Sequence, residues 1–219
     1  MHVSVNAAMS ADGKLSSRRR EQIRISGEGD FARVDRLRAE ADAVVVGVGT
    51  VLADDPSLVR HDETHRASLK NAESRPPARV VVDSNCRTPA DADVLAGAPE
   101  TYVLTSEAAS EDRRRTLRAA GAELLAAGET RVDLSAAFSA LEDNGIDRTM
   151  VEGGGELIFS LFESGLVDEL SVYVGSLVIG GRDAPTLADG EGFLEGFPEL
   201  ELDSVERIDS GVVLSWTVI

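Results

Sequence analysis

The sequence is short of several residue types, and each shortage narrows the classes of protein that it can encode. Its 219 residues include one cysteine, Cys86, so no disulfide can form within the chain. With only His2, His61 and His65 besides, the chain lacks the Cys- and His-rich pattern of a zinc site, and we expect no metal. No apolar run approaches the roughly 20 residues that span a bilayer. The N-terminus does not resemble a signal peptide, so we expect a soluble, cytoplasmic protein.

Basic residues are also scarce relative to acidic ones. The chain has 39 Asp and Glu against 22 Lys and Arg, a net charge of −17, and its only lysines are Lys14 and Lys70. Such a surface repels nucleic acids and anionic membranes, which excludes both as partners. Because the acidic residues are spread along the whole chain, we interpret them as a halophilic adaptation rather than as an acidic binding tail.

Aromatic residues make up only 4% of the chain, so the core must be built from Val, Leu, Ile and Ala. Fully apolar runs at 43–47, 79–84 and 101–106 are typical of strands buried on both faces. Further strands are predicted at 2–9, after Gly121, at 148–153, from 168 onward and at 211–219. One helix is predicted from Asp30, with Asp30 as its cap; the residues on its apolar face are Phe31, Val34, Leu37 and Ala41. Three more helices are predicted: one that ends at Ala120, one over 133–143, and one after the glycines at 153–155.

The alternation of strand and helix predicts a single α/β domain over residues 1–219. We expect a mostly parallel central sheet with flanking helices. The last fifty residues are mostly strand, which predicts antiparallel additions at one edge. The only linker-like segment, 61–78, is a polar stretch that holds His61 and His65, and we interpret it as a solvated loop. It lies too near the start of the chain to separate two domains.

Three glycines, Gly153 to Gly155, follow a predicted strand and precede a predicted helix. Free N–H groups and the positive dipole end favour a phosphate at such a turn. A tight turn with no ligand explains the glycines equally well. The dinucleotide fingerprint G-x-G-x-x-G is absent, because the sixth position from Gly153 is Ile158 and from Gly47 is Leu52.

Polar loops follow three more predicted strands. In residues 47–60, Thr50, Asp54 and Asp55 could bind a ligand, or the stretch could be only a capped turn. In residues 6–15, the polar side chains could likewise form a site, or the stretch could be only a hairpin turn; they are Asn6, Ser10, Asp12 and Lys14. Residues 83–89 offer Ser84, Asn85 and Arg87, which suit a phosphate monoester such as the 2′-phosphate of NADP, or only a polar loop with an inert Cys86 thiol.

Loops at the carboxyl ends of parallel strands converge on one crevice. These loops carry binding groups but no Ser-His-Asp set and no nucleophile–base pair. Such a site suits hydride transfer, in which the cofactor carries the chemistry.

Several stretches together resemble the riboflavin-biosynthesis reductases, in nearly the whole chain and in the right order. They are "SADGKL", "LRAEADAVVVGVGTVLADDPSL", "RVVVDSNCRTP", "VEGGGEL" and "GLVDELSVYV...IGG". The resemblance implies a dihydrofolate-reductase-like fold and is greatest to the stand-alone archaeal and fungal type. Bacterial relatives fuse this domain to a zinc deaminase, whose H-x-E and P-C-x-x-C pair is absent here. An archaeal source fits the acidic, lysine-poor composition.

The resemblance also implies a reaction and a set of site residues. NADPH, or alternatively NADH, would reduce C1′ of a ribosylamino group on a phosphorylated pyrimidine, giving the ribitylamino product. Asp12 and Lys14 match the family's turn and are the candidates for a catalytic role. Thr50, Asp54, Ser84, Asn85, Cys86, Arg87, Gly153, Gly154, Gly155 and Glu156 would line the NADPH site, and Ser10, Arg38, Leu58 and Glu152 would face the substrate.

Two other functions stay open from the sequence. One is a dihydrofolate or pterin reductase on the same fold, and the other is a nucleotide-binding regulatory domain without turnover. Glu152 together with Arg38 argues for a substrate site, because a domain that binds only the cofactor does not need them. The resemblance further implies a homodimer, with the strand-rich C-terminus as its interface.

Overall fold

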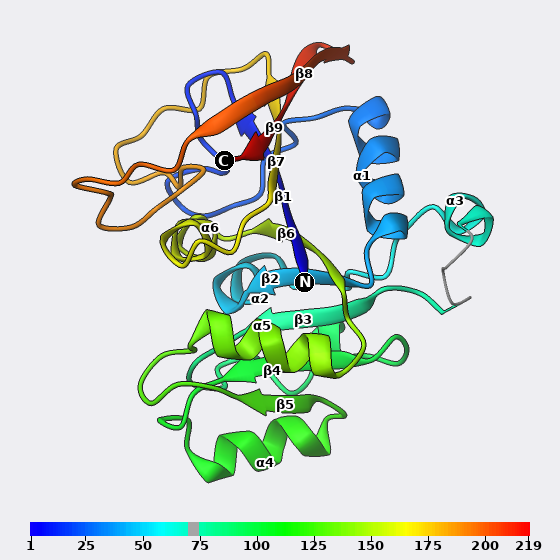
Figure 1. Ribbon diagram of the computed structural model, residues 1–219, viewed down its shortest axis with the longest axis vertical. Coiled ribbons are helices and arrows are strands. Elements are labelled where there is room, and N and C mark those ends of the chain that lie inside the picture. Colours follow the sequence, from blue (N-terminus) through cyan, green and yellow to red (C-terminus); the bar gives the residue numbers. More distant parts are fainter. Residues whose placement is uncertain (70–74) are drawn as a thin grey trace.

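The computed structural model describes residues 1–69 and 75–219, and in these residues nine strands form one sheet. The strand order is β5-β4-β3-β2-β6-β1-β7-β9-β8 (Figure 1). The first seven strands in this order are parallel, and β9 and β8 add to β7 as an antiparallel edge. The mostly parallel sheet with an antiparallel C-terminal edge is therefore confirmed. The strands are β1 (His2–Ser10), β2 (Ala43–Gly47), β3 (Ala78–Val82), β4 (Thr101–Thr105), β5 (Glu123–Ala126), β6 (Arg148–Gly153), β7 (Glu169–Gly175), β8 (Leu200–Ile208) and β9 (Gly211–Val218).

Helices lie on both faces of this sheet, as the apolar runs in the strands predict. Alternate residues of each central strand point to opposite faces, so Val45 and Val44 enter two different cores. Helices α5 and α6 cover the Val45 face, and α2 and α4 cover the Val44 face. The helices are α1 (Glu28–Glu40), α2 (Val48–Asp54), α3 (Glu63–Ser68), α4 (Glu111–Ala119), α5 (Leu134–Asp143) and α6 (Gly155–Glu163), with a 3₁₀ turn at Asp93–Leu95.

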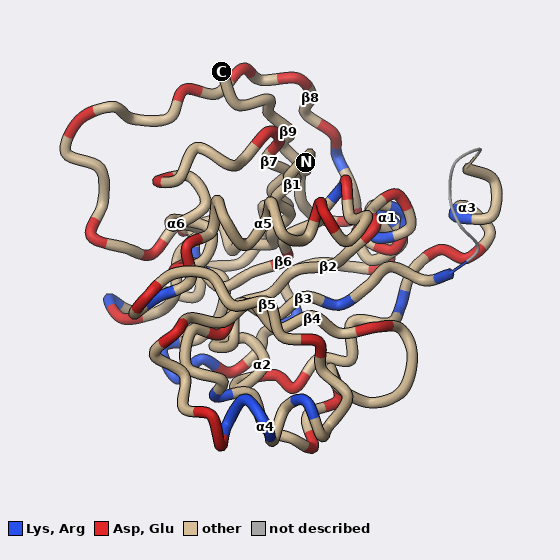
Figure 2. Tube along the Cα trace, turned by 60° about the horizontal axis from the view of Figure 1, so that its bottom comes forward, with Lys and Arg blue, Asp and Glu red and all other residues tan. Residues whose placement is uncertain are grey.

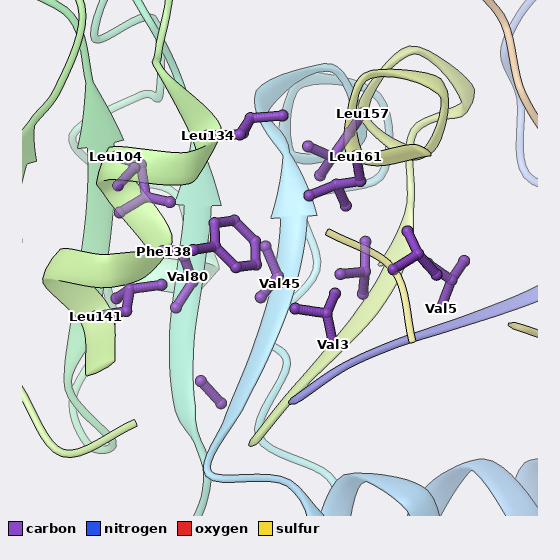
Figure 3. Close-up of a cluster of buried hydrophobic side chains, with 14 of the residues drawn as sticks. Val3, Val5, Val45, Val80, Leu104, Leu134, Phe138, Leu141, Leu157 and Leu161 are labelled. Atoms are coloured by element: carbon purple, nitrogen blue, oxygen red, sulfur yellow. The ribbon is translucent and has the colours of Figure 1, made fainter. Parts of the chain in front are cut away.

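The larger core is aliphatic, in line with the low aromatic content. Phe138 of α5 packs beside Val80 and Val45, and α6 contributes Leu157 and Leu161 (Figure 3). These side chains fix α6 directly against the sheet. The turn from β6 into α6, which holds the three glycines, is therefore rigidly placed.

The chain order places that turn at the point where the sheet changes direction. The strands β2 to β5 progress toward one edge, and the chain then returns to insert β6 between β2 and β1. Val46 of β2 pairs with Gly153 of β6, so the carboxyl ends of these two strands lie side by side. Crevices at such switch points are where open α/β sheets bind ligands.

Helix α1 differs from the sequence-based prediction in its start and in its buried face. It begins at Glu28, and its N-cap Gly27 supplies no side chain. The carboxylate of Asp209, in the β8–β9 turn, instead accepts hydrogen bonds from the N–H groups of Gly29 and Asp30 at 3.2 and 3.0 Å. Asp30 is thus not the cap, and its own side chain is buried against Arg33.

The predicted apolar face of α1 is correct in part: Ala41 is buried and Val34 and Leu37 are half-buried, but α1 also meets the sheet through a polar contact. Arg33 donates to Asn6 of β1 at 2.8 Å and to Ser171 of β7 at 2.9 Å. Phe31, expected in the core, is 38% exposed, with the guanidinium of Arg24 5.4 Å from its ring centre. Helical periodicity located the helix and most of its inner face, but it placed Phe31 wrongly and missed the polar contact through Arg33.

Two expected loops contain short helices. Residues 48–54, interpreted as a polar loop, form α2, whose Val48 and Val51 are buried. Part of the predicted solvated loop 61–78 forms α3, where Asp62 caps the N–H of His65 and Arg66 is buried. Arg66 donates hydrogen bonds to the carbonyls of Ala39 and Ala41 and so caps the C-terminal end of α1. Lys70 and the rest of 70–74 lie outside the described residues.

The charge distribution agrees with the composition. Asp and Glu occur along helices, loops and β8, whereas a cluster of arginines lies on α4 (Figure 2). Among the helices of the described residues, none is long and apolar enough to cross a membrane.

Candidate active site

A large cleft opens at the carboxyl ends of β1, β2, β3 and β6, with a volume of about 1330 Å³. Its walls come from the segments that follow these strands. Of the ten residues predicted to contact the cofactor, nine line it: Thr50, Asp54, Ser84, Asn85, Arg87, Gly153, Gly154, Gly155 and Glu156. The loops after β2, β3 and β6 converge as predicted, whereas the residues named for the loop after β1 do not line the cleft.

The glycine turn presents backbone N–H groups to the cleft. Gly153 and Gly154 have φ angles of 150° and 85°, in the region that favours glycine. Ile158 N donates to Gly154 O, so the N–H groups of Gly155, Glu156 and Leu157 precede the first hydrogen-bonded turn of α6. A Cβ added at Gly153 or Gly154 would point toward Thr50, 3.9 and 3.8 Å from its hydroxyl oxygen. The turn therefore leaves room where a phosphate can approach the backbone, and the residues present fit a dinucleotide.

Gly155 has a different role from its two neighbours. A Cβ there would collide with the carbonyl oxygen of Thr186 and lie 2.9 Å from the Asp189 carboxylate. Asp189 N donates to Gly155 O at 3.0 Å, and its carboxylate binds the N–H and hydroxyl of Thr186. Gly155 therefore permits the segment after β7 to close over the start of α6.

The loop after β3 divides its side chains between the cleft and the core. Ser84 accepts a hydrogen bond from Val132 N at 3.0 Å, which ties this loop to the one before α5. The Arg87 side chain is 53% exposed and lines the cleft. Cys86 turns inward instead and contacts Thr105 at 3.2 Å, and burial raises the pKa of its thiol. The thiol of Cys86 is therefore a core group and does not line the cleft.

The segment after β2 contributes Thr50 and Asp54 from α2. Thr50 lies beside the glycine turn in the cleft wall. Partial burial raises the pKa of the Asp54 carboxyl above its ordinary value. These groups can exchange hydrogen bonds with the hydroxyls of a ligand, as the sequence predicts.

Arg38 and Glu152, both predicted to face the substrate, form a two-hydrogen-bond ion pair with each other. Arg38 Nε and Nη2 donate to the two Glu152 carboxylate oxygens at 2.5 and 2.7 Å. Both side chains are largely buried, and only Glu152 lines the cleft. Burial works against the charge of Arg38, but Glu152 and Asp35 outweigh it and hold the guanidinium pKa above its ordinary value.

The pairing leaves Arg38 behind the cleft wall, and a second arginine occupies the wall itself. Arg60 lines the cleft and its side chain is 70% exposed. Its Nε donates to Asp35 at 2.7 Å, and its carbonyl accepts from Arg38 at 3.0 Å. Arg60 was not among the predicted site residues, although it is the last residue of the polar 47–60 stretch.

Four other predicted residues lie away from the cleft. Ser10 is fully buried and donates to Asp12 at 2.6 Å, and Leu58 packs into the core beside α2. Asp12 also accepts from the N–H groups of Ile179 and Gly180, and these bonds, that from Ser10 first, lower its pKa to about 2. Lys14 donates to the Ala184 carbonyl at 3.1 Å. The two catalytic candidates thus tie the turn after β1 to the segment after β7.

Within residues 1–69 and 75–219, no group of three or more His, Cys, Asp or Glu side chains is arranged to hold a metal ion. The features present define an α/β protein with a strand–glycine–helix turn that opens into a cleft at the switch point of its sheet.

The chain belongs to the RibD C-terminal domain family, whose model matches residues 1–214. It is 47% identical, over 98% of its length and 96% of the relative's, to the 2,5-diamino-6-ribosylamino-4(3H)-pyrimidinone 5′-phosphate reductase of Archaeoglobus fulgidus. It is 42% identical to the protein of the same name from Methanothermobacter thermautotrophicus, over 99% of this chain and 98% of that one. The resemblance found in the sequence is confirmed.

Solved structures agree on the fold. Acinetobacter baumannii RibD, at 24% identity, superposes with a TM-score of 0.79 over the whole chain, which spans 58% of that protein. The riboflavin biosynthesis reductase Rib7 of Saccharomyces, at 21% identity, superposes with a TM-score of 0.73, covering this chain fully and 90% of its own.

Proposed function

We propose that this chain is one reductase domain over residues 1–219, active in the cytoplasm. It would reduce the ribosylamino side chain of 2,5-diamino-6-ribosylamino-4(3H)-pyrimidinone 5′-phosphate to the ribitylamino product in riboflavin biosynthesis. The observation that carries the proposal is the 47% identity, over nearly the full length of both chains, to a reductase of that name. The grouping of nine predicted cofactor residues in one cleft supports it.

The electron donor we propose is NADPH, which supplies a hydride when it is bound. The free N–H groups at the start of α6 would hold the pyrophosphate beside Gly153 and Gly154. Thr50 and Asp54, in the cleft wall, would bind ribose hydroxyls. The exposed guanidinium of Arg87 would hold the 2′-phosphate, which favours NADPH over NADH.

The substrate would lie against the wall formed by Glu152 and Arg60. Both Glu152 oxygens bind Arg38, but a carboxylate has about four lone-pair sites, so two remain for the pyrimidine's amino groups. Because Arg38 is committed to Glu152, Arg60 is the better candidate for the substrate phosphate. The polar wall would thus orient the pyrimidine at one end and the phosphate at the other.

A substrate comparison tests this function. Purified protein should oxidise NADPH when the ribosylaminopyrimidinone phosphate is added and should leave dihydrofolate unreduced. Turnover of dihydrofolate alone would assign the protein to the folate-reducing enzymes on this fold. NADPH binding with no turnover of either compound would indicate a regulatory domain.

We further propose that the protein is a homodimer joined through its antiparallel edge. In the part of the chain that the structure describes, β8 is the edge strand and only one of its sides is paired; Leu202 and Val205 on it are 54% and 59% exposed. Long edge strands with exposed apolar side chains favour pairing with another chain. Light scattering should give a dimer for the wild type and a monomer for Leu202→Asp. A wild-type monomer at micromolar concentration would contradict this interface.

A further inference from the structure

Four charged side chains form a continuous chain along the cleft wall: Glu152, Arg38, Asp35 and Arg60. Arg38 binds Glu152 at 2.5 Å and lies 3.7 Å from Asp35, and Asp35 binds Arg60 Nε at 2.7 Å. Glu152 and Arg60 line the cleft, and the two members between them do not. Among the described residues, the carboxylate of Asp35 is the one side chain that binds the guanidinium of Arg60.

We propose that Asp35 is a positioning residue, which holds the guanidinium of Arg60 on the cleft wall so that Arg60 can bind the substrate's phosphate. The inference deepens the proposed function and rests on it. Asp35 does not line the cleft, so it would act on a ligand only through Arg60, and no motif in the sequence points to it.

The backbone around Arg60 is held without the Asp35 carboxylate. Arg38 Nη1 donates to Arg60 O at 3.0 Å, and Asp62 N donates to the main-chain oxygen of Asp35 at 2.8 Å. These two bonds fasten the loop to α1. The Asp35 carboxylate thus fixes the side chain of Arg60 rather than the path of the loop.

The difference in burial makes this contact effective. The Asp35 side chain is 15% exposed and belongs to a helix, whereas Arg60 is 70% exposed and belongs to a loop. An exposed arginine samples many rotamers, and a phosphate must then bear the entropic cost of ordering it. A fixed carboxylate on Nε orders the side chain beforehand. It also leaves Nη1 and Nη2 free, the pair that can bind two phosphate oxygens side by side.

The charge balance within the network of Glu152, Arg38, Asp35 and Arg60 also suits an anionic ligand. The two carboxylates and two guanidinium groups of this network sum to zero, so the network adds no negative charge to a cleft whose lining residues include more acidic than basic side chains. Within the network, a phosphate that approaches Arg60 meets no carboxylate without a guanidinium partner.

The test is a double-mutant cycle with Asp35→Ala, Arg60→Ala and the two combined. The readouts are the Kd for ribose 5-phosphate by calorimetry, the substrate KM and kcat, and the Kd for NADPH. Asp35→Ala should raise the ribose 5-phosphate Kd and the KM about tenfold, with kcat and NADPH binding within about twofold. In the Arg60→Ala background the same change should alter the Kd less than about twofold, because Asp35 acts only through Arg60.

Asp30→Ala is the matched control. It removes another α1 carboxylate that binds an arginine, Arg33, but one that faces the sheet and not the cleft. It should lower the melting temperature at least as much as Asp35→Ala and leave the ribose 5-phosphate Kd unchanged. If the Kd for ribose 5-phosphate rises in both variants in proportion to the loss of melting temperature, the positioning role is overturned.

The remaining outcomes separate this inference from the proposed function. Equal effects of Asp35→Ala with and without Arg60, or no effect of Arg60→Ala on ribose 5-phosphate, would overturn the inference even if the pyrimidinone is reduced. Coupled effects on ribose 5-phosphate in a protein that fails to reduce the pyrimidinone would support the positioning role and refute the proposed reaction.

Discussion

At the scale of single residues, Arg38 and Glu152 show how the structure changes the roles that the sequence suggested. Both were predicted to face the substrate; in the structure they bind each other, which leaves Glu152 on the cleft wall and Arg38 behind it. They are 114 positions apart, and no sequence pattern joins them. The stretch "VEGGGEL" indicated that Glu152 lies at the site, but only the fold shows which charge neutralises it.

Glu152→Gln should weaken substrate use and stability together. The amide keeps one acceptor, so the largely buried Arg38 loses half of its bidentate partner and the neutralising charge. We expect the free energy of unfolding to fall by about 1–3 kcal/mol. The substrate KM should rise and the Kd for NADPH should not change. Chemical denaturation and steady-state kinetics measure these. Glu156→Gln, an exposed carboxylate on the same turn, is the control and should cost less stability. Loss of NADPH binding in Glu152→Gln would instead assign Glu152 to the cofactor side.

Arg87→Ala should change the preference between cofactors. If Arg87 holds the 2′-phosphate, its removal should raise the Kd for NADPH by about tenfold to a hundredfold, the range for losing a charge-assisted hydrogen bond. The Kd for NADH should stay nearly unchanged. Fluorescence titration with both dinucleotides measures this, and Arg87→Lys should keep part of the preference. Equal losses for NADPH and NADH would remove this role.

At the scale of elements, the sequence predicted the strands better than the helices. Runs such as 43–47 are apolar at every position because both faces are covered, and no alternative structure fits them. Helix α1 carries Phe31 and Leu37 at helical spacing, yet it packs on Asn6 and Ser171 through Arg33. This contact is polar because its partners lie in β1 and β7, which are separate from α1 in sequence. The periodicity of residues within α1 therefore could not predict it.

The same limit applies to the predicted site. The cofactor positions were found because they follow strands, and parallel strands end together. Leu58 and Cys86 sit in those loops too, but both have positive φ angles, 53° and 51°, and turn into the core. Inward and outward positions in a loop depend on such backbone turns, which residue type alone does not fix.

The junction between α6 and the segment after β7 gives a test at this scale. Gly155→Ala would place a methyl group against the Thr186 carbonyl, which the fold must move to relieve. We expect a loss of about 1–3 kcal/mol in the free energy of unfolding, the usual effect of overpacking. Gly49→Ala is the matched control, since its Cβ meets nothing within 4 Å and it lies in α2. That change should be neutral or stabilising, and equal losses in both variants would contradict the packing argument.

At the scale of the whole molecule, charge is the dominant feature. The net charge of −17 is distributed over the surface, so the folded state repels itself at long range (Figure 2). Within the cleft, by contrast, Arg60, Arg87 and Arg131 offset part of the acidic charge. A cleft with cationic positions on an acidic protein is suited to binding phosphorylated ligands from solution.

Salt should stabilise this protein. Screening shortens the range of the repulsion, so the melting temperature should rise as KCl increases from 0.01 to about 1 M, where the Debye length falls from about 30 to 3 Å. NaCl should act alike, because screening does not depend on the identity of the cation. Calorimetry measures the transition, and a melting temperature that does not rise with KCl would refute the halophilic interpretation.

We propose that this chain transfers a hydride from a reduced nicotinamide to C1′ of the ribosylamino side chain. The most direct measurement is product analysis with NADPH deuterated at the transferring position of the nicotinamide. We expect a ribitylamino product that carries one deuterium at C1′, identified by mass and NMR. A product without deuterium at C1′, or an unchanged pyrimidinone beside protein that binds NADPH, would contradict it.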